Sequence, residues 1–106
     1  MVRDDPLFSV VVPAFNREDH IGSCLASVEA QGFGNLEVVV VDDGSSDDTL
    51  HIVRSMSDPR VRVVTTPHRG LVSALNTGVS HCKGRYIARL DADDVATPDR
   101  LERQIP

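Results

Sequence analysis

Short runs of apolar, mostly β-branched residues alternate along the chain with longer segments in which apolar residues recur every three or four positions. The short runs are Phe8–Val12, Leu36–Val41, Arg60–Thr65 and Arg85–Leu90, and they predict strands. The longer segments are Glu18–Gln31, Asp47–Met56, Gly70–Cys82 and Thr97–Ile105, and their spacing predicts helices. The pattern is therefore one of strands and helices in strict alternation.

The same spacing indicates which helical residues should face a core. Pro13 should end the first strand, and Gly32 should end the first helix. Thr97 is a suitable N-cap for the last helix, with Pro98 at its first position. The positions expected to be buried are Ile21, Leu25 and Val28 on the first helix, Leu50, Val53 and Met56 on the second, and Leu71, Leu75 and Val79 on the third.

Alternating strands and helices favour the α/β class, in which right-handed crossovers join parallel strands of a Rossmann-like sheet. We expect the strand order 3-2-1-4, with Val10–Val12 and Val38–Val41 in the two central strands. The segment Arg60–Thr65 alternates apolar and polar residues, which is typical of an edge strand. In such sheets ligands bind beyond the carboxyl ends of the strands.

Polar clusters fall at those carboxyl ends: PAFNR after the first strand, DDGSSDD after the second, PHRG after the third and DADD after the fourth. The chain has 106 residues, enough for one small domain, and its net charge of −5 argues against a nucleic-acid-binding surface. An anionic ligand is compatible with that charge if a metal ion supplies positive charge.

The sequence also limits where the protein works. Its start lacks the apolar stretch of a secretory signal, and its longest apolar runs are too short to span a bilayer. Cys24 and Cys82 fit no zinc-binding spacing and are interpreted as a reduced pair of small core residues. A cytoplasmic location is expected, with membrane association of a longer protein left open.

The loops after the first two strands have both a local and a functional interpretation. Locally, Asn16 is a suitable N-cap for the first helix, and Ser45 with Asp48 fits a capping box for the second. Capping leaves Asp42 and Asp43 unexplained, and we expect them to face the cleft. A carboxylate there is able to accept a hydrogen bond from a base N–H or a ribose hydroxyl.

Two further residues near the cleft remain open between alternatives. Phe15 either packs in the core or stacks against a base, an interaction worth about 1–3 kcal/mol. Arg69 either reaches a diphosphate or a base carbonyl, or lies in solvent as an ordinary loop arginine. His68 beside it is a lone loop histidine, and such residues are seldom ligands.

The acidic stretch after the fourth strand gives the sharpest prediction. Asp91 and Asp93 lie two residues apart, so in an extended segment their side chains would project to one side and suit Mg²⁺ or Mn²⁺. The plainest alternative is a turn with solvated aspartates. DADDV also fits the nucleophile loop of haloacid dehalogenase-like phosphatases, although in that family the loop follows the first strand.

Taken in order, the motifs PAFN, VDDGSSDDT, ALNTGVSHCKGRYIARLDADD and PDRL resemble the N-terminal half of family 2 glycosyltransferases, which have the GT-A fold. The resemblance extends from Phe8 to about Ile105. It implies that residues 1–106 form a partial GT-A domain, the N-terminal part of a catalytic domain that transfers a sugar from a nucleotide diphosphate sugar, expected to be a UDP-sugar, in polysaccharide or glycolipid synthesis. A non-catalytic nucleotide-binding remnant is the alternative.

The resemblance also implies roles for individual residues. The base is expected to lie against Pro13, Ala14, Phe15, Asn16 and Asp43, with Asp42 beside them. Asp91 is expected near the ribose and Asp93 on the Mg²⁺ or Mn²⁺ ion that binds the diphosphate. Many members have Arg before the Asn of the third helix, where this chain has Leu75, and Arg69 is the expected substitute. The acceptor site and the general base belong to a later segment, so no residue here takes that role.

Overall fold

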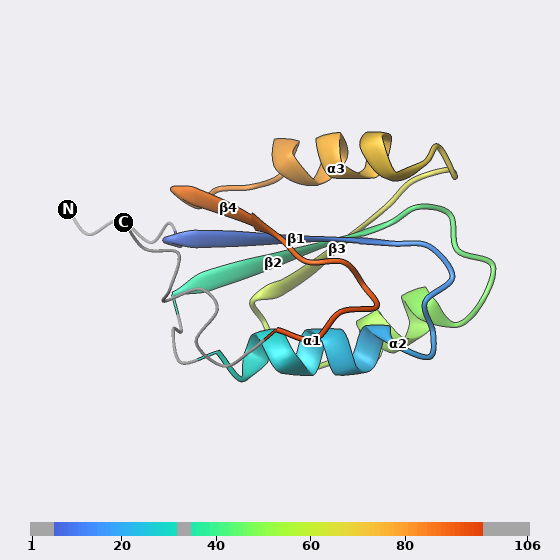
Figure 1. Ribbon diagram of the computed structural model, residues 1–106, viewed down its shortest axis with the longest axis horizontal. Coiled ribbons are helices and arrows are strands. Elements are labelled where there is room, and N and C mark those ends of the chain that lie inside the picture. The colour runs from blue at the N-terminus through green and yellow to red at the C-terminus, as the bar shows by residue number, and fades with distance from the viewer. Residues whose placement is uncertain (1–5, 32–34, 97–106) are drawn as a thin grey trace.

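The computed structural model describes residues 6–31 and 35–96 (Figure 1). The elements in chain order are strand β1 (Phe8–Ala14), helix α1 (Ile21–Glu29), strand β2 (Leu36–Asp42), helix α2 (Thr49–Ser55), strand β3 (Val61–Thr65), helix α3 (Leu71–Ser80) and strand β4 (Tyr86–Arg89). The predicted alternation of strands and helices is confirmed over this range. The helix predicted at Thr97–Ile105 lies outside the described residues.

The strands form one parallel sheet in the order β3-β2-β1-β4, as predicted. Val10 on β1 is in register with Val38 on β2 and with Ala88 on β4. Because all strands run the same way, their carboxyl ends meet at one end of the sheet, on the right in Figure 1. The loops that carry the polar clusters therefore converge there.

Helices cover both faces of the sheet, with α1 and α2 on one side and α3 on the other (Figure 1). The larger core joins Ile21, Leu25 and Val28 of α1 to alternate strand residues such as Val10 and Val38. The smaller core, on the opposite face, holds Val39, Val41 and Ala74. In the part of the chain that is described, no helix is long and apolar enough to cross a membrane.

Helix α3 packs on the sheet through a different face from the predicted one. Its buried residues are Ala74 and Gly78, whereas Leu71 and Val79 are 50% and 48% exposed. The prediction chose the large apolar residues, which is the usual choice for a core face. Here small residues bring the helix backbone close to the sheet, and the large side chains remain at the margin.

The close approach of α3 predicts a strong effect of one added methyl group. A Cβ on Gly78 would overlap Val11 Cγ1 and lie 3.2 Å from Val41 Cγ2. Gly78→Ala should therefore lower the free energy of unfolding by about 1–3 kcal/mol, the usual cost of overpacking. Chemical denaturation monitored by circular dichroism measures this change.

Gly22→Ala on α1 is the matched control, since its Cβ would lie 3.9 Å from Ile52 Cγ2, an ordinary contact. Helix propensity alone should make that variant more stable by up to about 1 kcal/mol. A Gly78→Ala protein as stable as Gly22→Ala would contradict the packing of α3 described here.

Strand β1 continues past Pro13 to Ala14, so the prediction that Pro13 ends it is wrong. The carbonyl oxygens of Leu7 and Val11 accept hydrogen bonds from Tyr86 and Leu90, which shows that odd-numbered residues of β1 direct their backbone toward β4. Pro13 lies on that side but beyond the last paired residue of β4, Arg89. Its missing N–H therefore costs no bond of the sheet.

A buried polar cluster ties the turn before β4 to the other strands. Glu37 Oε2 accepts hydrogen bonds from Ser9 Oγ (2.6 Å) and from the backbone N–H of Lys83 (2.6 Å), and Oε1 accepts one from Arg62 Nη2 (2.9 Å). Gly84 N–H donates to Ser9 Oγ at 2.8 Å. Burial acts to raise the pKa of Glu37, but these hydrogen bonds outweigh it and hold the pKa below its ordinary value. The cluster thus fixes where β4 begins.

Candidate functional site

A pocket of about 350 Å³ opens where the carboxyl ends of the strands meet. This volume lies within the range of about 300–1,000 Å³ that is typical of small-molecule sites. The predicted site residues that line it are Pro13, Ala14, Phe15, Asp43, Asp91 and Asp93. The structure therefore brings together, from three different loops, the aromatic residue and the carboxylates chosen from the sequence.

Other predicted residues are not part of the lining. Asn16, Asp42 and Arg69 do not line this pocket. Asp42 is buried and shares the parity of Val38 and Val40, whose side chains lie beneath α1 and α2. The expectation that Asp42 faces this cleft is therefore wrong, because strand alternation directs its side chain to the opposite face of the sheet.

Residues not chosen from the sequence complete the lining: Arg17, His68, Gly70, Leu71, Ala74, Arg89 and Ala92. Leu71 and Ala74 come from the start of α3 and form an apolar wall. Arg17 lies at the Phe15 side of the pocket, and Arg89 projects from the end of β4. The pocket thus combines apolar surface with groups of both charges.

Asp43 is the most strongly bonded carboxylate of the pocket. Its Oδ1 accepts the backbone N–H of Arg69 at 2.9 Å, and its Oδ2 accepts that of Gly70 at 3.0 Å. His68 Nδ1 lies 3.0 Å from Oδ2 and 3.1 Å from the backbone oxygen of Asp43. Both atoms are acceptors, so Nδ1 carries the hydrogen. Asp43 therefore holds the loop before α3 in place.

The pKa of Asp43 lies below its ordinary value. Burial acts to raise that pKa, but the two backbone N–H donors and His68 stabilise the charged form and outweigh burial. The carboxylate is thus kept ionised inside the pocket, where it remains an acceptor. An ionised carboxylate is a strong hydrogen-bond acceptor for a base N–H or a ribose hydroxyl.

Phe15 lies against His68, with ring centroids 4.0 Å apart and planes inclined by 23°. Phe15 is 38% exposed, so it is not a core residue. The loop of Gly44 packs closely on the same histidine, because a Cβ at Gly44 would lie 2.7 Å from His68 N. The positive φ of Gly44, 74°, adds to the reason for glycine at this position. Phe15 and His68 thus form a two-ring wall of the pocket.

The loops after β1 and β2 are joined by hydrogen bonds, which replace the capping roles predicted for them. Asn16 N–H donates to Ser45 Oγ at 2.9 Å, and Asn16 Oδ1 accepts the N–H of Ser46 at 2.9 Å. Asn16 has a positive φ of 52° and is not the N-cap of α1, which is His20. The prediction of Asn16 as a cap is therefore wrong, because its side chain bridges to the neighbouring loop.

The predicted capping box of Ser45 and Asp48 is also absent, since α2 begins after Asp48 without a side-chain cap. Instead, Glu18 Oε2 accepts the N–H of Asp48 at 2.9 Å, and Thr49 Oγ1 accepts the N–H of Arg17 at 2.9 Å. These donors and acceptors come from opposite loops. The mutual bonding ties the loop after β1 to the loop after β2.

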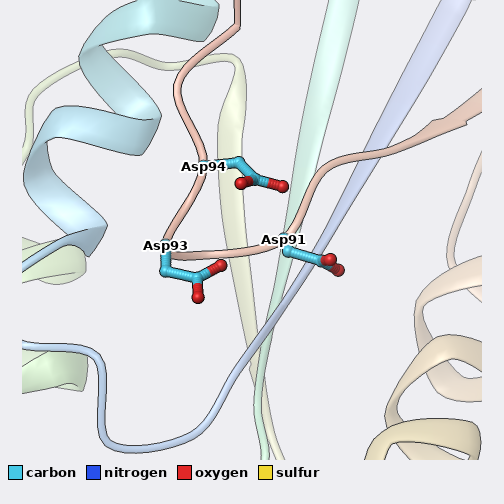
Figure 2. Close-up of side chains that lie close together, drawn as sticks. All are labelled: Asp91, Asp93 and Asp94. Carbon is cyan, nitrogen blue, oxygen red and sulfur yellow. The ribbon is translucent and has the colours of Figure 1, made fainter.

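The acidic loop after β4 is a tight turn. The N–H of Asp94 donates to the backbone oxygen of Asp91 at 2.9 Å. Figure 2 shows Asp91, Asp93 and Asp94 side by side on this loop, and one carboxylate oxygen from each lies within 4.8 Å of the other two. The turn, rather than the extended segment expected, brings these oxygens together, and it adds Asp94 to the two predicted residues.

Three carboxylate oxygens at this separation fit a hard divalent cation. Mg²⁺ and Mn²⁺ favour oxygen ligands, and Mg²⁺ is usually held by one or two carboxylates while substrate phosphates and water complete its shell. Asp91 is half-buried, and Asp93 and Asp94 are exposed, so the cluster is accessible to further ligands. The donor set therefore suits a metal shared with a phosphate-bearing ligand.

The sequence matches a known protein family over most of its length. Residues 9–106 match the model of the family described as glycosyl transferase family 2. The chain belongs to glycosyl transferase family 2. The match includes every loop that lines the pocket, and it bears out the resemblance seen in the motifs.

Relatives within glycosyl transferase family 2 are much longer than this chain. The chain is 43% identical to a chondroitin synthase of Escherichia coli over 99 residues, which are 92% of the chain and 14% of that synthase. It is 40% identical over 103 residues to a UDP-Glc:alpha-D-GlcNAc-diphosphoundecaprenol beta-1,3-glucosyltransferase of Escherichia coli, covering 96% of the chain and 41% of that enzyme. The chain therefore spans less than half the length of either relative.

Solved structures of similar proteins share the fold of this family 2 chain. The Staphylococcus aureus TarS fragment 1–349 with UDP-GlcNAc matches 91% of the chain with a TM-score of 0.85 and 33% identity, over 29% of that fragment. A Pyrobaculum calidifontis mannosyltransferase with GDP-Man and Mn²⁺ also matches 91%, with a TM-score of 0.81 and 35% identity, over 30% of its length. The sheet and flanking helices are thus those of glycosyltransferases.

Proposed function

We propose that this chain is the donor-binding part of a metal-dependent glycosyltransferase that takes its sugar from a nucleoside diphosphate sugar, with UDP as the nucleotide. The observation that carries the proposal is the pocket itself. It has an aromatic ring and an ionised carboxylate, Phe15 and Asp43, at one side and the acidic loop of Asp91 and Asp93 at the other. A nucleoside diphosphate has matching parts: a flat base, hydroxyl and N–H donors, and phosphates that bind metal.

The ligands bound in similar structures and the descriptions of similar proteins support this assignment. One neighbour was solved with UDP-GlcNAc and another with GDP-Man and Mn²⁺. One relative is described as a chondroitin synthase, a name that refers to synthesis of a polysaccharide. The description of the glucosyltransferase relative includes UDP-Glc. We infer a role in polysaccharide or glycolipid synthesis and a cytoplasmic location for this part of the chain.

The proposal gives a definite task to the aromatic and acidic residues of the site. Phe15, backed by His68, offers a flat apolar surface to the base, and Asp43 accepts a hydrogen bond from the base or the ribose. Asp91 and Asp93, with Asp94, would hold the metal ion. When bound, the ion supplies Lewis-acid stabilisation of the diphosphate as the bond to the sugar breaks. Asn16 and Arg69 stay predicted nucleotide contacts outside the pocket lining.

The alternative of a haloacid dehalogenase-like phosphatase gains no support from the structure. That activity requires its aspartate nucleophile in the loop after the first strand. Here the loop after β1 carries Phe15 and Asn16, and the DADD turn follows β4. No observation therefore favours phosphatase chemistry at this site.

A calorimetric panel tests the proposal. UDP, GDP, ADP and uridine are titrated into the protein with Mn²⁺ and, separately, with a chelator. We expect UDP to bind more tightly than ADP or GDP, and more tightly with Mn²⁺ than without it. Failure of every nucleotide to bind under both conditions would refute the assignment of the pocket.

Phe15→Ala should weaken binding of UDP and of uridine alike, because the ring that faces the base is lost. Stacking of a base on an aromatic side chain is worth about 1–3 kcal/mol, so the expected loss of affinity is roughly tenfold or more. Phe15→Tyr keeps the ring and is expected to bind nearly as wild type. Equal affinity of the Ala and Tyr variants for uridine would show that Phe15 does not contact the base.

A further inference from the structure

Arg89 is a cation at the acidic side of the pocket that the proposed function has not yet used. Ala88 and Leu90 are buried in the larger core, so alternation along β4 directs Arg89 to the other face of the sheet, toward α3. There Arg89 is in register with Val11, and it lines the pocket with Leu71 and Ala74. A charged side chain thus lines the same pocket as the apolar wall and the acidic turn.

Arg89 meets the first aspartate of that turn. Its Nε lies 3.0 Å and its Nη2 2.9 Å from Asp91 Oδ1. The side chains of Arg89 and Asp91 are 48% and 45% exposed, so the ion pair is open to solvent. Exposed pairs of this kind contribute little to stability, and a stronger partner replaces them at low cost.

The charge of the pocket indicates what that stronger partner is. The carboxylates of Asp91, Asp93 and Asp94 together carry three negative charges, so one divalent ion among them leaves the turn negative. A diphosphate adds further negative charge beside it, in a protein whose net charge is already −5. Among the described residues, the arginines that line the pocket are Arg17, on the Phe15 loop, and Arg89, which adjoins the turn. A guanidinium is well suited to phosphate oxygens.

We propose that Arg89 is a donor-binding residue that changes partner: it pairs with Asp91 in the nucleotide-free protein and donates to the diphosphate when nucleotide and metal are bound. The proposal rests on the proposed function, because it needs the diphosphate in this pocket. Arg89 therefore has two opposing effects on ligand binding. The side chain attracts the diphosphate, and it competes with the metal for Asp91.

The test compares Arg89→Met, Arg89→Lys and Arg85→Met. Arg85 precedes β4, does not line the pocket and has its guanidinium carbon 5.9 Å from the centroid of the Tyr86 ring, so Arg85→Met is the matched loss of one positive charge. Calorimetry measures binding of UDP with Mn²⁺ and of uridine, and electron paramagnetic resonance measures binding of Mn²⁺ alone. Thermal melting confirms that all variants are folded.

Arg89→Met should bind UDP roughly tenfold more weakly, which is the usual value of one charge-assisted hydrogen bond. Its affinity for uridine should be unchanged, and its affinity for Mn²⁺ alone should be unchanged or higher by up to about fivefold. The affinity of Arg89→Lys for UDP should lie between those of Arg89→Met and wild type. Arg85→Met should match wild type in all three titrations.

Two results would overturn the proposal. One is wild-type affinity of Arg89→Met for UDP. The other is a parallel loss of UDP, uridine and Mn²⁺ binding in that variant, which would make Arg89 a structural residue. A wild-type protein that binds neither UDP nor uridine would instead refute the proposed function, so the two failures are distinguishable.

Discussion

Asp93→Asn should lower the affinity for UDP in the presence of Mn²⁺ by at least about tenfold, while UDP binding in the presence of a chelator stays unchanged. The reason is that Asp93 is an exposed carboxylate of the turn and lines the pocket, so its oxygen is available to a shared metal ion. Loss even of an outer-shell partner of a metal commonly costs about 10–100-fold in affinity, and loss of a ligand should cost no less. Calorimetry with and without Mn²⁺ measures the difference.

Asp19→Asn is the matched control, because Asp19 is exposed and does not line the pocket. Asp94→Asn is informative in its own right, since the turn rather than the sequence spacing places Asp94 in the cluster. It should reduce the effect of Mn²⁺ less than Asp93→Asn does, because Asp94 does not line the pocket. Equal dependence on Mn²⁺ in wild type and Asp93→Asn would remove Asp93 from the metal site.

The second large effect is on stability. Asp43→Asn should lower the free energy of unfolding by at least about 2 kcal/mol, because hydrogen bonds to charged groups are worth about 1.5–3 kcal/mol each. Asp43 accepts the N–H groups of Arg69 and Gly70 and contacts His68. An amide group retains only one acceptor oxygen and turns its NH₂ toward donors. Denaturant unfolding at neutral pH measures the loss.

The adjacent Asp42 provides a matched control, because it is equally buried but less well hydrogen-bonded. It is as buried as Asp43, each being 3% exposed, but its Oδ1 has no hydrogen-bond partner among the described residues. Asp42→Asn replaces a buried carboxyl group of which one oxygen has no partner among the described residues, so stability should be unchanged or higher. A large loss of stability in Asp42→Asn, with no loss of stability in Asp43→Asn, would show that the roles of the two carboxylates are reversed.

The stability contributed by Asp43 should depend on pH in a definite direction. Its pKa is lowered in the folded protein, so the contribution is fully present above the unfolded value of about 3.9 and is lost as pH falls through the lower folded value. The difference in free energy of unfolding between wild type and Asp43→Asn should therefore be large at neutral pH and shrink below about pH 4. A gap that grows as the solution is acidified below pH 4 would contradict the lowered pKa.

The fold could be predicted from the sequence because its signals are regular and agree with one another. The runs around Val10 and Val38 are apolar on both faces, which marks central strands of a parallel sheet. The alternating run Arg60–Thr65 marks an edge strand, and β3 lies at the edge of the sheet. The face of α3 could not be predicted, since periodicity favours Leu71 and Val79, whereas contact with Val11 selects the small residues Ala74 and Gly78.

Residues of the candidate site could be predicted where they stand in a recognisable motif. They were missed where their hydrogen-bond partners lie on loops distant in the sequence. Phe15, Asp43, Asp91 and Asp93 stand in recognisable motifs and line the pocket. The bonds of Asn16 reach about 30 residues along the chain to Ser45 and Ser46, which no local capping rule foresees.

His68 and Arg89 were missed for different reasons. His68 is placed by its contacts with Asp43 and Phe15, and a lone loop histidine gives no sequence signal of such partners. Arg89 did carry a signal. It stands two residues before Asp91 on a strand, a spacing that predicts projection to the same side of the sheet.

The central claim is that a metal ion on the acidic turn and a nucleotide in the pocket bind side by side. Paramagnetic broadening of backbone amide signals by Mn²⁺ in the presence of UDP tests it most directly. We predict that Mn²⁺ broadens the signals of residues 91–94 first and broadens the phosphorus signals of UDP as well. Broadening centred instead on Glu18, Asp47 and Asp48, acidic residues that are joined by hydrogen bonds and do not line the pocket, would contradict the account.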